Sequence, residues 1–406
     1  MIIKWYSRQF AKAKSFFKAY PQYIPLCAML LLFALPINLY LIVHGLSKVP
    51  IPVLKKHKFI TQRPSFSVDK FLNGTLQKEY EYWFNENNPL RSTLVKFNNQ
   101  FYYSLFTKSL MYDSNLIIGK KNFIYEKVYI DQYVNLNKTD YSVQQFEKWA
   151  QDLKAISDHF AKQGKLFIYL ITPSKVAFYP EYLPSSYQKR INNPRPDYYL
   201  KIEALKKSGV AYFDASNYIV NAKAKAYGEL LFTQGGTHWT MLSAALTTRK
   251  MLKIISKLTN VELSPLKFTY SEAFKPQFVD KDLLELCKLL FPNLKYRVPQ
   301  ITFEESENNS PLKLAIIGGS FTHFFRTLFA ETKHFSQVDH FYYLILNHYQ
   351  VSKDGSVKEV PIHQEDSHSY KTIFAADVVI LEENELLPYS NHMKELYFQV
   401  FGTRPA

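Results

Sequence analysis

Two short motifs in this chain of 406 residues place a hydroxyl and an imidazole on turns where such groups can react. Ser320 follows Gly318 and Gly319 directly after the apolar run 313–317, as when a buried parallel strand ends at a tight turn. The glycines permit a sharp backbone, so the hydroxyl can stand exposed at the strand's carboxyl end, facing the free N–H groups of a helix predicted over 322–330. Because a Gly-Gly-Ser turn is more often an ordinary turn, Ser320 needs a chemical partner.

The partner predicted from the sequence is His238, in the motif Gly236-Thr-His-Trp239. It precedes a predicted helix over 241–257, for which Thr240 suits the N-cap. A serine hydroxyl is a poor nucleophile at neutral pH unless a base takes its proton, and imidazole titrates in the right range. A loop histidine beside glycines usually has no such role, so the hypothesis depends on the two motifs meeting in space.

The elements around these motifs alternate between strands and helices, which favours a three-layer α/β/α domain with a parallel sheet. The predicted strands are 166–171, 210–213, 312–317, 342–346 and 378–381. In such sheets the ligand crevice lies beyond the carboxyl ends of the strands. Thr172-Pro-Ser-Lys175, Asp214, Ser320 and Glu382 all occupy predicted strand ends, so we expect them to line one crevice.

The first 63 residues contain ten Lys or Arg and no Asp or Glu, against a net charge of +15 for the whole chain. The remainder is too weakly basic to indicate a nucleic-acid-binding protein. Residues 24–43 carry no charge and are long enough to cross a bilayer, which predicts a transmembrane anchor over 24–45 between a basic segment (1–23) and a linker (46–64). A cleaved signal peptide is the alternative, but no small-residue cleavage site follows.

Residues 65–140 are predicted to form a small helical and hairpin extension, with helices over 69–84 and 91–106 and a hairpin over 116–125. Ser142 and Gln145 then make a capping box for the first helix of the main domain, 141–406. Cys27 lies in the predicted span and Cys287 is alone in the rest, so no disulfide is expected within the main domain.

The order of several motifs resembles the alginate O-acetyltransferase family of membrane-anchored or periplasmic SGNH-hydrolase-like proteins. The motifs are Asn85-Glu-Asn-Asn-Pro-Leu-Arg91, the hairpin 117–125, Thr172-Pro-Ser-Lys175, Gly236-Thr-His-Trp239, Gly319-Ser-Phe321 and Val379-Ile-Leu-Glu-Glu-Asn-Glu385. The resemblance implies a flavodoxin-like SGNH domain in the periplasm, with the N-terminus in the cytoplasm of a bacterium. It also implies acetyl transfer to a surface or secreted polysaccharide, together with a polytopic membrane-bound O-acyltransferase.

Carried over by residue, the resemblance makes Ser320 the nucleophile and His238 the general base. The family has an Asp two residues before this His, where this chain has Gly236. Three hypotheses follow: Asp214 or Glu382 supplies the acid, a Ser-His dyad suffices, or the protein binds polysaccharide without catalysis. Under the dyad hypothesis, Gly236→Asp is expected to raise activity.

Other residues have weaker claims on the site. Asp366-Ser-His368 has Asp-x-His spacing and follows the serine, as in ordinary SGNH enzymes, but lies in a polar stretch before a helix. His323 is expected to be a helix residue. The backbones of Gly319 and Phe321 are candidates to bind the oxyanion, and Lys175 and Trp239 are candidate substrate-side residues.

The mechanism expected from these residues is a double displacement through an acetylated Ser320, with no metal or other cofactor. A sugar hydroxyl as second acceptor makes the protein a transferase, whereas water makes it a carbohydrate acetylesterase. A non-catalytic polysaccharide-binding factor is the third possibility, for which exposed Tyr and Trp side chains matter more than Ser320.

Overall fold

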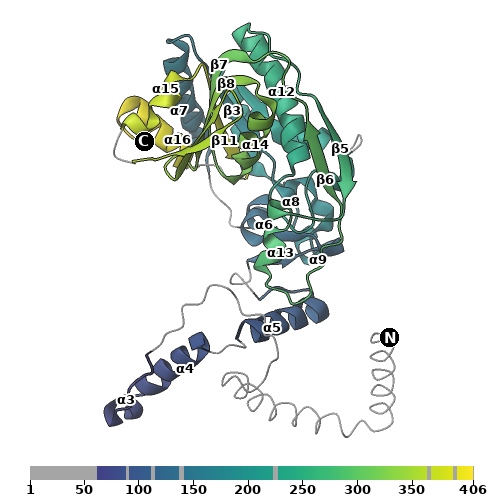
Figure 1. The fold of residues 1–406 in the computed structure, drawn as a ribbon, viewed down its shortest axis with the longest axis vertical. Helices are drawn as coiled ribbons and strands as arrows, with labels where there is room; N and C mark the ends of the chain where they lie inside the picture. The colour runs from purple at the N-terminus through teal and green to yellow at the C-terminus, as the bar shows by residue number, and fades with distance from the viewer. Residues whose placement is uncertain are drawn as a thin grey trace. The chain divides into compact units, whose positions relative to one another are not determined.

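The structure is a computed structural model that describes residues 62–87, 91–110, 115–136, 141–222, 227–363, 367–386 and 391–405. The chain divides into two compact units, Met1–Asn98 and Asn99–Ala406 (Figure 1). In the first unit, α3 (Val68–Leu72) and α4 (Thr75–Asn87) replace the single helix predicted over 69–84. The break falls at Gly74, whose φ of 77° is left-handed. Helix α5 (Arg91–Phe106) has the predicted bounds and crosses the boundary between the units.

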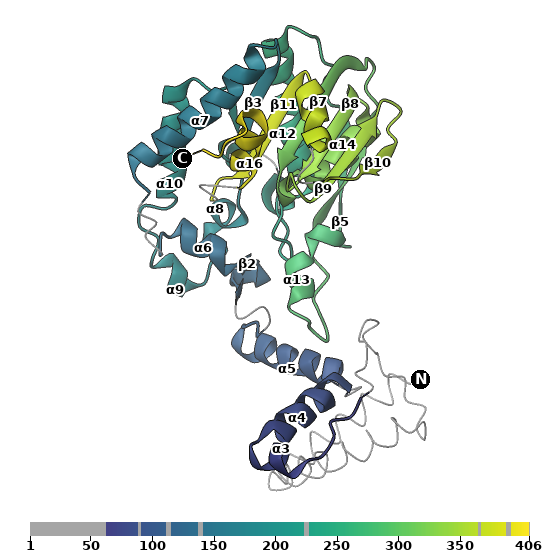
Figure 2. The same ribbon diagram turned by 90° about the vertical axis from the view of Figure 1, so that its left-hand side faces the viewer.

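A seven-stranded mixed sheet forms the centre of the second unit, in the order β10-β9-β8-β7-β11-β3-β4 (Figure 2). Its strands are β3 (Leu166–Thr172), β4 (Tyr212–Asp214), β7 (Ser310–Gly318), β8 (Phe335–Tyr342), β9 (Asn347–Ser352), β10 (Val357–Val360) and β11 (Val378–Asn384). Strands β8, β7, β11, β3 and β4 are parallel, whereas β9 and β10 pair antiparallel. The α/β prediction is confirmed, but the sheet is parallel only from β8 to β4.

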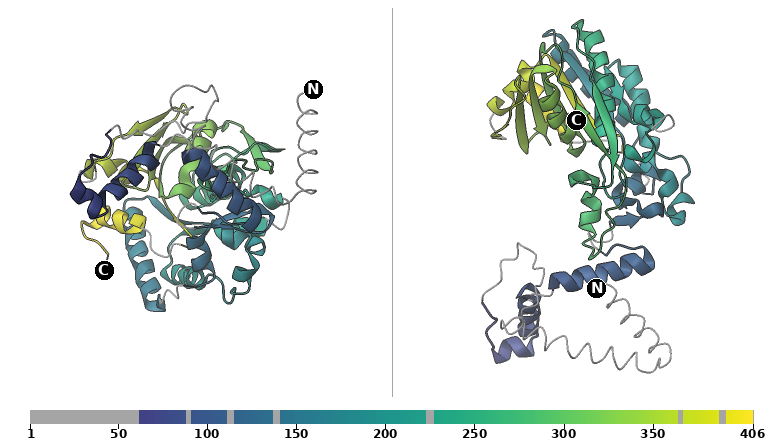
Figure 3. Two further views of the ribbon diagram at one scale, coloured as in Figure 1. Left: turned by 90° about the horizontal axis from the view of Figure 1, so that it is seen from below. Right: turned by 45° about the vertical axis from the view of Figure 1, so that its right-hand side comes forward.

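Helices cover both faces of this sheet because alternate residues of its buried strands point to opposite sides. In β3, Phe167, Tyr169 and Ile171 join one core with α7 (Val143–Ala161), α10 (Pro196–Ser208), α15 (Lys371–Ala375) and α16 (Asn391–Phe401). Ile168 and Leu170 join the other core with α11 (Ala215–Ala222), α12 (Met241–Thr259) and α14 (His323–Thr332). The three predicted layers are therefore present, and Figure 3 shows them from two further directions.

Residues 343–346, predicted as part of a strand, instead form the turn between β8 and β9. Tyr343 and Leu344 both have left-handed backbones, with φ of 51° and 46°. The N–H of Tyr343 donates to the carbonyl of Gly318 at 2.8 Å, which fastens the turn to the end of β7. The apolar run is misleading because the side chain of Leu344 is buried in the core while its backbone turns.

The remaining elements include the predicted hairpin, which is confirmed as antiparallel β1 (Leu116–Ile118) and β2 (Ile124–Glu126). Leu116 and Ile124 pack on Leu283 and Leu284 of α13 (Asp282–Leu286) in a small separate core. The Ser142–Gln145 capping box is also present. The other elements are η2 (Lys120–Asn122), α6 (Lys127–Tyr133), α8 (Lys175–Phe178), η3 (Pro180–Tyr182), α9 (Ser185–Gln188), η5 (Gly228–Leu230), β5 (Phe268–Ala273), η6 (Phe278–Asp280), β6 (Val298–Phe303), η7 (Ser320–Thr322) and η8 (Ser367–Tyr370).

Within the described ranges, no helix is long and apolar enough to cross a bilayer. The anchor predicted over 24–45 lies outside those ranges, as do the basic segment 1–23 and most of the linker 46–64.

Candidate functional site

Ser320 lies where the sequence predicts it, at the carboxyl end of β7 and at the first position of η7, which leads into α14. Its side chain is half-buried. The turn needs glycine at 318, because a Cβ there would lie 2.6 Å from Oε2 of Glu382. The N–H of Gly319 donates to that same oxygen at 2.9 Å. Of the two predicted oxyanion donors, Gly319 therefore already has an acceptor, while Phe321 lies in the first turn of η7, where helix N–H groups have no intrahelical acceptor.

The structure brings the His238 loop onto this turn. The imidazole of His238 lies 5.2 Å from the ring of Phe321 and 5.7 Å from that of His323, measured between centroids. Trp239 is fully buried, and its Nε1–H donates to the carbonyl of Phe321 at 2.9 Å. Trp239 thus holds the His238 loop against the Ser320 turn, an internal contact in place of the substrate-side position expected for it.

Lys175 also joins separate segments of the site through buried hydrogen bonds. Its ammonium group is buried and donates to the carbonyls of Ile124, Gln234 and Gly236 at 2.7–2.8 Å. These contacts join the β1–β2 hairpin to the loop that carries His238. Burial lowers the pKa of Lys175 to about 7, and the charges of Asp282 and Glu126 oppose that shift.

The carboxylate that meets His238 is Asp282, which the sequence reasoning did not single out. Its Oδ2 accepts from Nδ1 of His238 at 2.8 Å, and the His238 side chain is only 13% exposed. Its Oδ1 accepts the backbone N–H groups of Thr237 at 2.9 Å and Leu283 at 2.7 Å. Because an ionised carboxylate can only accept, this contact assigns the donor role to Nδ1, and in the neutral imidazole Nε2 then keeps its lone pair.

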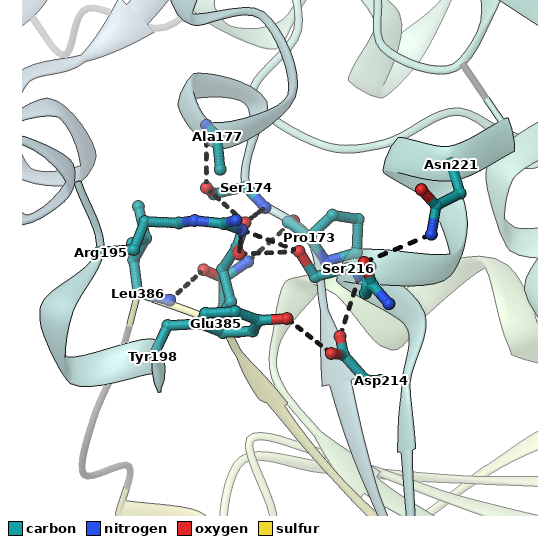
Figure 4. Close-up of polar contacts among 12 residues, drawn as sticks. Pro173, Ser174, Ala177, Arg195, Tyr198, Asp214, Ser216, Asn221, Glu385 and Leu386 are labelled. Atoms are coloured by element: carbon teal, nitrogen blue, oxygen red, sulfur yellow. Dashed lines mark hydrogen bonds and ion pairs between the residues drawn. The ribbon is translucent and has the colours of Figure 1, made fainter. Parts of the chain in front are cut away.

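Asp214 lies in a different polar cluster (Figure 4). Its carboxylate accepts from the hydroxyl of Tyr198 at 2.6 Å and from the N–H of Asn217 at 2.9 Å. Burial raises its pKa. Next to it, Glu385 accepts from Ser174, Arg195 and Ser216.

Glu382 lies under the serine turn. It is almost fully buried, and it accepts from the hydroxyl of Thr172 and the N–H of Gly319. Burial raises its pKa to about 7. Its contacts therefore hold the backbone before Ser320. Within the described residues, neither Glu382 nor Asp214 has a hydrogen bond to His238.

The other histidine candidates have different surroundings. Nδ1 of His323 contacts the carbonyl of Ser320 at 2.8 Å, and burial lowers the pKa of His323 to about 4. His368 lies in η8, whereas Asp366 lies outside the described residues. No group of three or more His, Cys, Asp or Glu in the described ranges could hold a metal ion.

Gly236, the position of the missing acid, has no room for a side chain. A Cβ there would lie 2.2 Å from the carbonyl oxygen of Val279 and 2.8 Å from Oγ1 of Thr233. Real Cβ atoms do not come this close to backbone, so the expectation that Gly236→Asp restores a carboxylate meets a steric obstacle.

Two hollows adjoin the site. A cavity of about 10 Å³ is lined by Tyr125, Glu126, Tyr129, Ser174, Lys175, Val176, Thr237 and Phe321. A groove of about 500 Å³ is lined by Tyr343, Leu344, Ile345, Leu346, Asn391, His392, Lys394, Glu395 and Arg404. The groove reaches the serine turn, because Tyr343 and His392 each lie 3.6 Å from the place of a Cβ on Gly319.

Comparison with known proteins agrees with the predicted resemblance. Residues 128–323, which include Ser320, His238 and Asp282, match the family model described as SGNH hydrolase-like domain, acetyltransferase AlgX. Over 228 residues the chain is 25% identical to a probable alginate O-acetylase AlgJ from Pseudomonas fluorescens. This alignment covers 55% of the chain and 54% of the relative, so the chain spans about half the length of the curated relative it matches.

Two solved structures are also similar. The O-acetyltransferase domain of Pseudomonas putida AlgJ matches with 17% identity and a TM-score of 0.45, covering 71% of this chain and 99% of that one. Pseudomonas aeruginosa AlgX matches with 13% identity and a TM-score of 0.43, covering 70% and 66% of the two chains.

Proposed function

We propose, from the confirmed resemblance of this chain to the alginate O-acetyltransferase family, that it transfers acetyl groups to hydroxyls of a cell-surface or secreted polysaccharide. The observation that carries the proposal is the placement of His238 over the turn of Ser320, with Nδ1 held by a carboxylate. The two motifs are far apart in sequence and meet at the carboxyl end of β7.

In the first half of the reaction, Nε2 of His238 takes the proton of the Ser320 hydroxyl as its oxygen attacks the acetyl carbonyl of the donor. The N–H groups of Ser320 and Phe321, in the first turn of η7, are the candidates to stabilise the oxyanion. The donor's leaving group departs with the proton from His238, and Ser320 remains acetylated.

In the second half, His238 deprotonates a sugar hydroxyl, whose oxygen attacks the acetyl-serine. The Ser320 oxygen leaves and regains its proton from His238. If water takes the place of the sugar, the same residues hydrolyse acetyl esters, which makes esterase activity the natural side reaction and the alternative function.

The acetyl donor and the location are part of the same proposal. A polytopic membrane-bound O-acyltransferase delivers the acetyl group, and a membrane anchor over 24–45 holds the domain in the periplasm. An alkaline phosphatase fusion after residue 64 is expected to be active and one before residue 20 inactive. The reverse pattern excludes a polysaccharide outside the cytoplasm as substrate.

The central test uses the full chain with a chromogenic acetyl ester and a purified oligosaccharide acceptor. We expect mass spectrometry of the quenched reaction to find the acetyl group on the peptide that contains Ser320. Ser320→Ala is expected to lose both the adduct and the transfer while it retains the thermal unfolding of the parent. Full transfer by Ser320→Ala excludes the acetyl-serine mechanism, and binding of oligosaccharide without any transfer by the parent favours a non-catalytic factor.

A further inference from the structure

We infer that Asp282 is the acid that orients His238, and that the backbone of residues 279–280 occupies the space in which a side chain at position 236 would lie. The inference rests on the proposed function, because an orienting acid has a role only if His238 is a base. In this interpretation Asp282, on a different element of the chain, supplies the carboxylate that a side chain at position 236 would otherwise supply.

The position of the Asp282 carboxylate is fixed on both sides. One oxygen is held by the backbone N–H groups of Thr237 and Leu283, and the other contacts Nδ1 of His238. Thr237 is the residue next to His238, so the carboxylate bridges the base loop and the start of α13. An ionised carboxylate in this position can stabilise an imidazolium.

The segment before Asp282 is docked on the base loop by several further hydrogen bonds. Thr233 and Tyr296 donate from their hydroxyls to the carbonyl of Asp280, at 2.6 and 2.8 Å. The N–H of Leu284 donates to the carbonyl of Gly235 at 2.9 Å. These bonds bring the carbonyl of Val279 to within 2.2 Å of the place of a Cβ on Gly236, so an acid at 236 and this segment exclude each other.

Other ionisable groups lie around His238 and Asp282. His323 of α14 lies beside the ring of His238, Glu126 of β2 accepts from the hydroxyl of Thr237, and the charge of Lys175 on α8 interacts with that of Asp282. Among the described residues, Asp282 is the acid whose oxygen contacts a His238 ring nitrogen. Its removal therefore tests the orientation of the base directly.

The experiment compares Asp282→Asn with the parent on a chromogenic acetyl ester across pH. We expect kcat to fall by roughly two to four orders of magnitude with little change in KM, because the amide can hold the wrong tautomer and cannot stabilise the imidazolium. The acidic limb of the pH–rate profile is expected to move to lower pH, since the imidazolium of His238 loses the negative charge that stabilises it. A purely structural role would not move this limb.

Asp280→Asn is the matched control. Asp280 lies two residues earlier on the same segment, and its side chain accepts from the N–H of Gln277 at 3.2 Å. Its pKa is raised to about 6 by burial. We expect Asp280→Asn to keep kcat within about threefold of the parent and to leave the acidic limb in place, and Asp282→Glu to recover part of the rate.

A further test places an acid at position 236, with Asp282 either present or replaced by Asn. We expect Gly236→Asp to reduce activity in the parent and to give no recovery in the Asp282→Asn background. Recovery by the double variant, or a parental rate and pH profile for Asp282→Asn, overturns the inference. A parent whose ester activity does not depend on Ser320 refutes the proposed function instead, so the two failures are distinguishable.

Discussion

Two clusters of polar side chains lie at the carboxyl edge of the sheet, and they differ in how completely their hydrogen bonds are satisfied. In the cluster around Glu385, the two carboxylate oxygens take donors from Ser174, Arg195 and Ser216 (Figure 4). Glu385 and both serines are almost fully buried, and Arg195 is partly buried. In the cluster around His238, one ring nitrogen is bound by Asp282, and among the described residues neither Nε2 nor the Ser320 hydroxyl has a hydrogen-bond partner.

Under the proposed function, this difference separates a structural cluster from a reactive one. A saturated buried network stabilises the fold and leaves no lone pair for a substrate. An imidazole with one nitrogen hydrogen-bonded and a lone pair on the other can accept a proton. Carboxylates at strand ends are therefore not equivalent, although Asp214, Glu382 and Glu385 have similar positions in the sequence pattern.

The largest effect on kcat is expected when the imidazole of His238, with its unbound Nε2, is removed. His238→Ala is expected to reduce kcat for a chromogenic acetyl ester by roughly four to six orders of magnitude, because serine then has no base. His323→Asn, on the neighbouring ring, is the control and is expected to lose at most about tenfold. A larger loss at His323 than at His238 reverses the assignment of the base.

The saturated cluster is expected to affect stability instead of chemistry. Glu385→Ala leaves the partly buried Arg195 without its carboxylate, which is expected to cost about 3–5 kcal/mol in the free energy of unfolding. Denaturant titration measures this loss, and kcat of the folded fraction is expected to stay near that of the parent. A stable variant without activity would place Glu385 in the reactive cluster.

Glu382 lies under the serine turn and is also buried, and its contribution is tested by the pH dependence of the free energy of unfolding. Burial disfavours the charge and raises the pKa of Glu382 from its usual value of 4.5 to about 7. Between these values the folded state keeps a proton that the unfolded state releases, so rising pH weakens folding, by up to about 3 kcal/mol from this group.

Unfolding free energies measured from pH 4.5 to 8 check this expectation. Glu382→Gln cannot ionise, so the fall in stability across that range is expected to be smaller by this amount. An identical pH dependence in the parent and the variant shows that Glu382 does not carry the proton.

The smallest effect is expected in the groove beside the serine turn. Tyr343 lines this groove with its ring close to Gly319, where an acceptor sugar can stack. Tyr343→Ala is expected to raise KM for an oligosaccharide acceptor about tenfold with little change in ester hydrolysis, whereas Tyr343→Phe keeps the ring and the parental KM. Equal acceptor KM values in all three proteins exclude the groove as the acceptor site.

Several features of the fold and site were predictable because they depend on neighbouring residues. The apolar run before Gly318 and Gly319 forms β7 and ends at Ser320, and the Thr-His-Trp loop precedes α12 as its N-cap chemistry indicates. The turn at 343–346 was not predictable, because Leu344 is as buried as a strand residue and only its backbone conformation distinguishes it.

The sequence by itself determined the alternation of strands and helices, the turn of Ser320 and the loop of His238, since each is set by local patterning and turn chemistry. Only the tertiary structure decided which carboxylate meets His238. Asp282 begins a five-residue helix and looks in the sequence like any acid in a first helical turn. Its role comes from hydrogen bonds that dock residues 279–284 onto the loop of Gly236, and a long-range contact of this kind leaves no periodic signal in the chain.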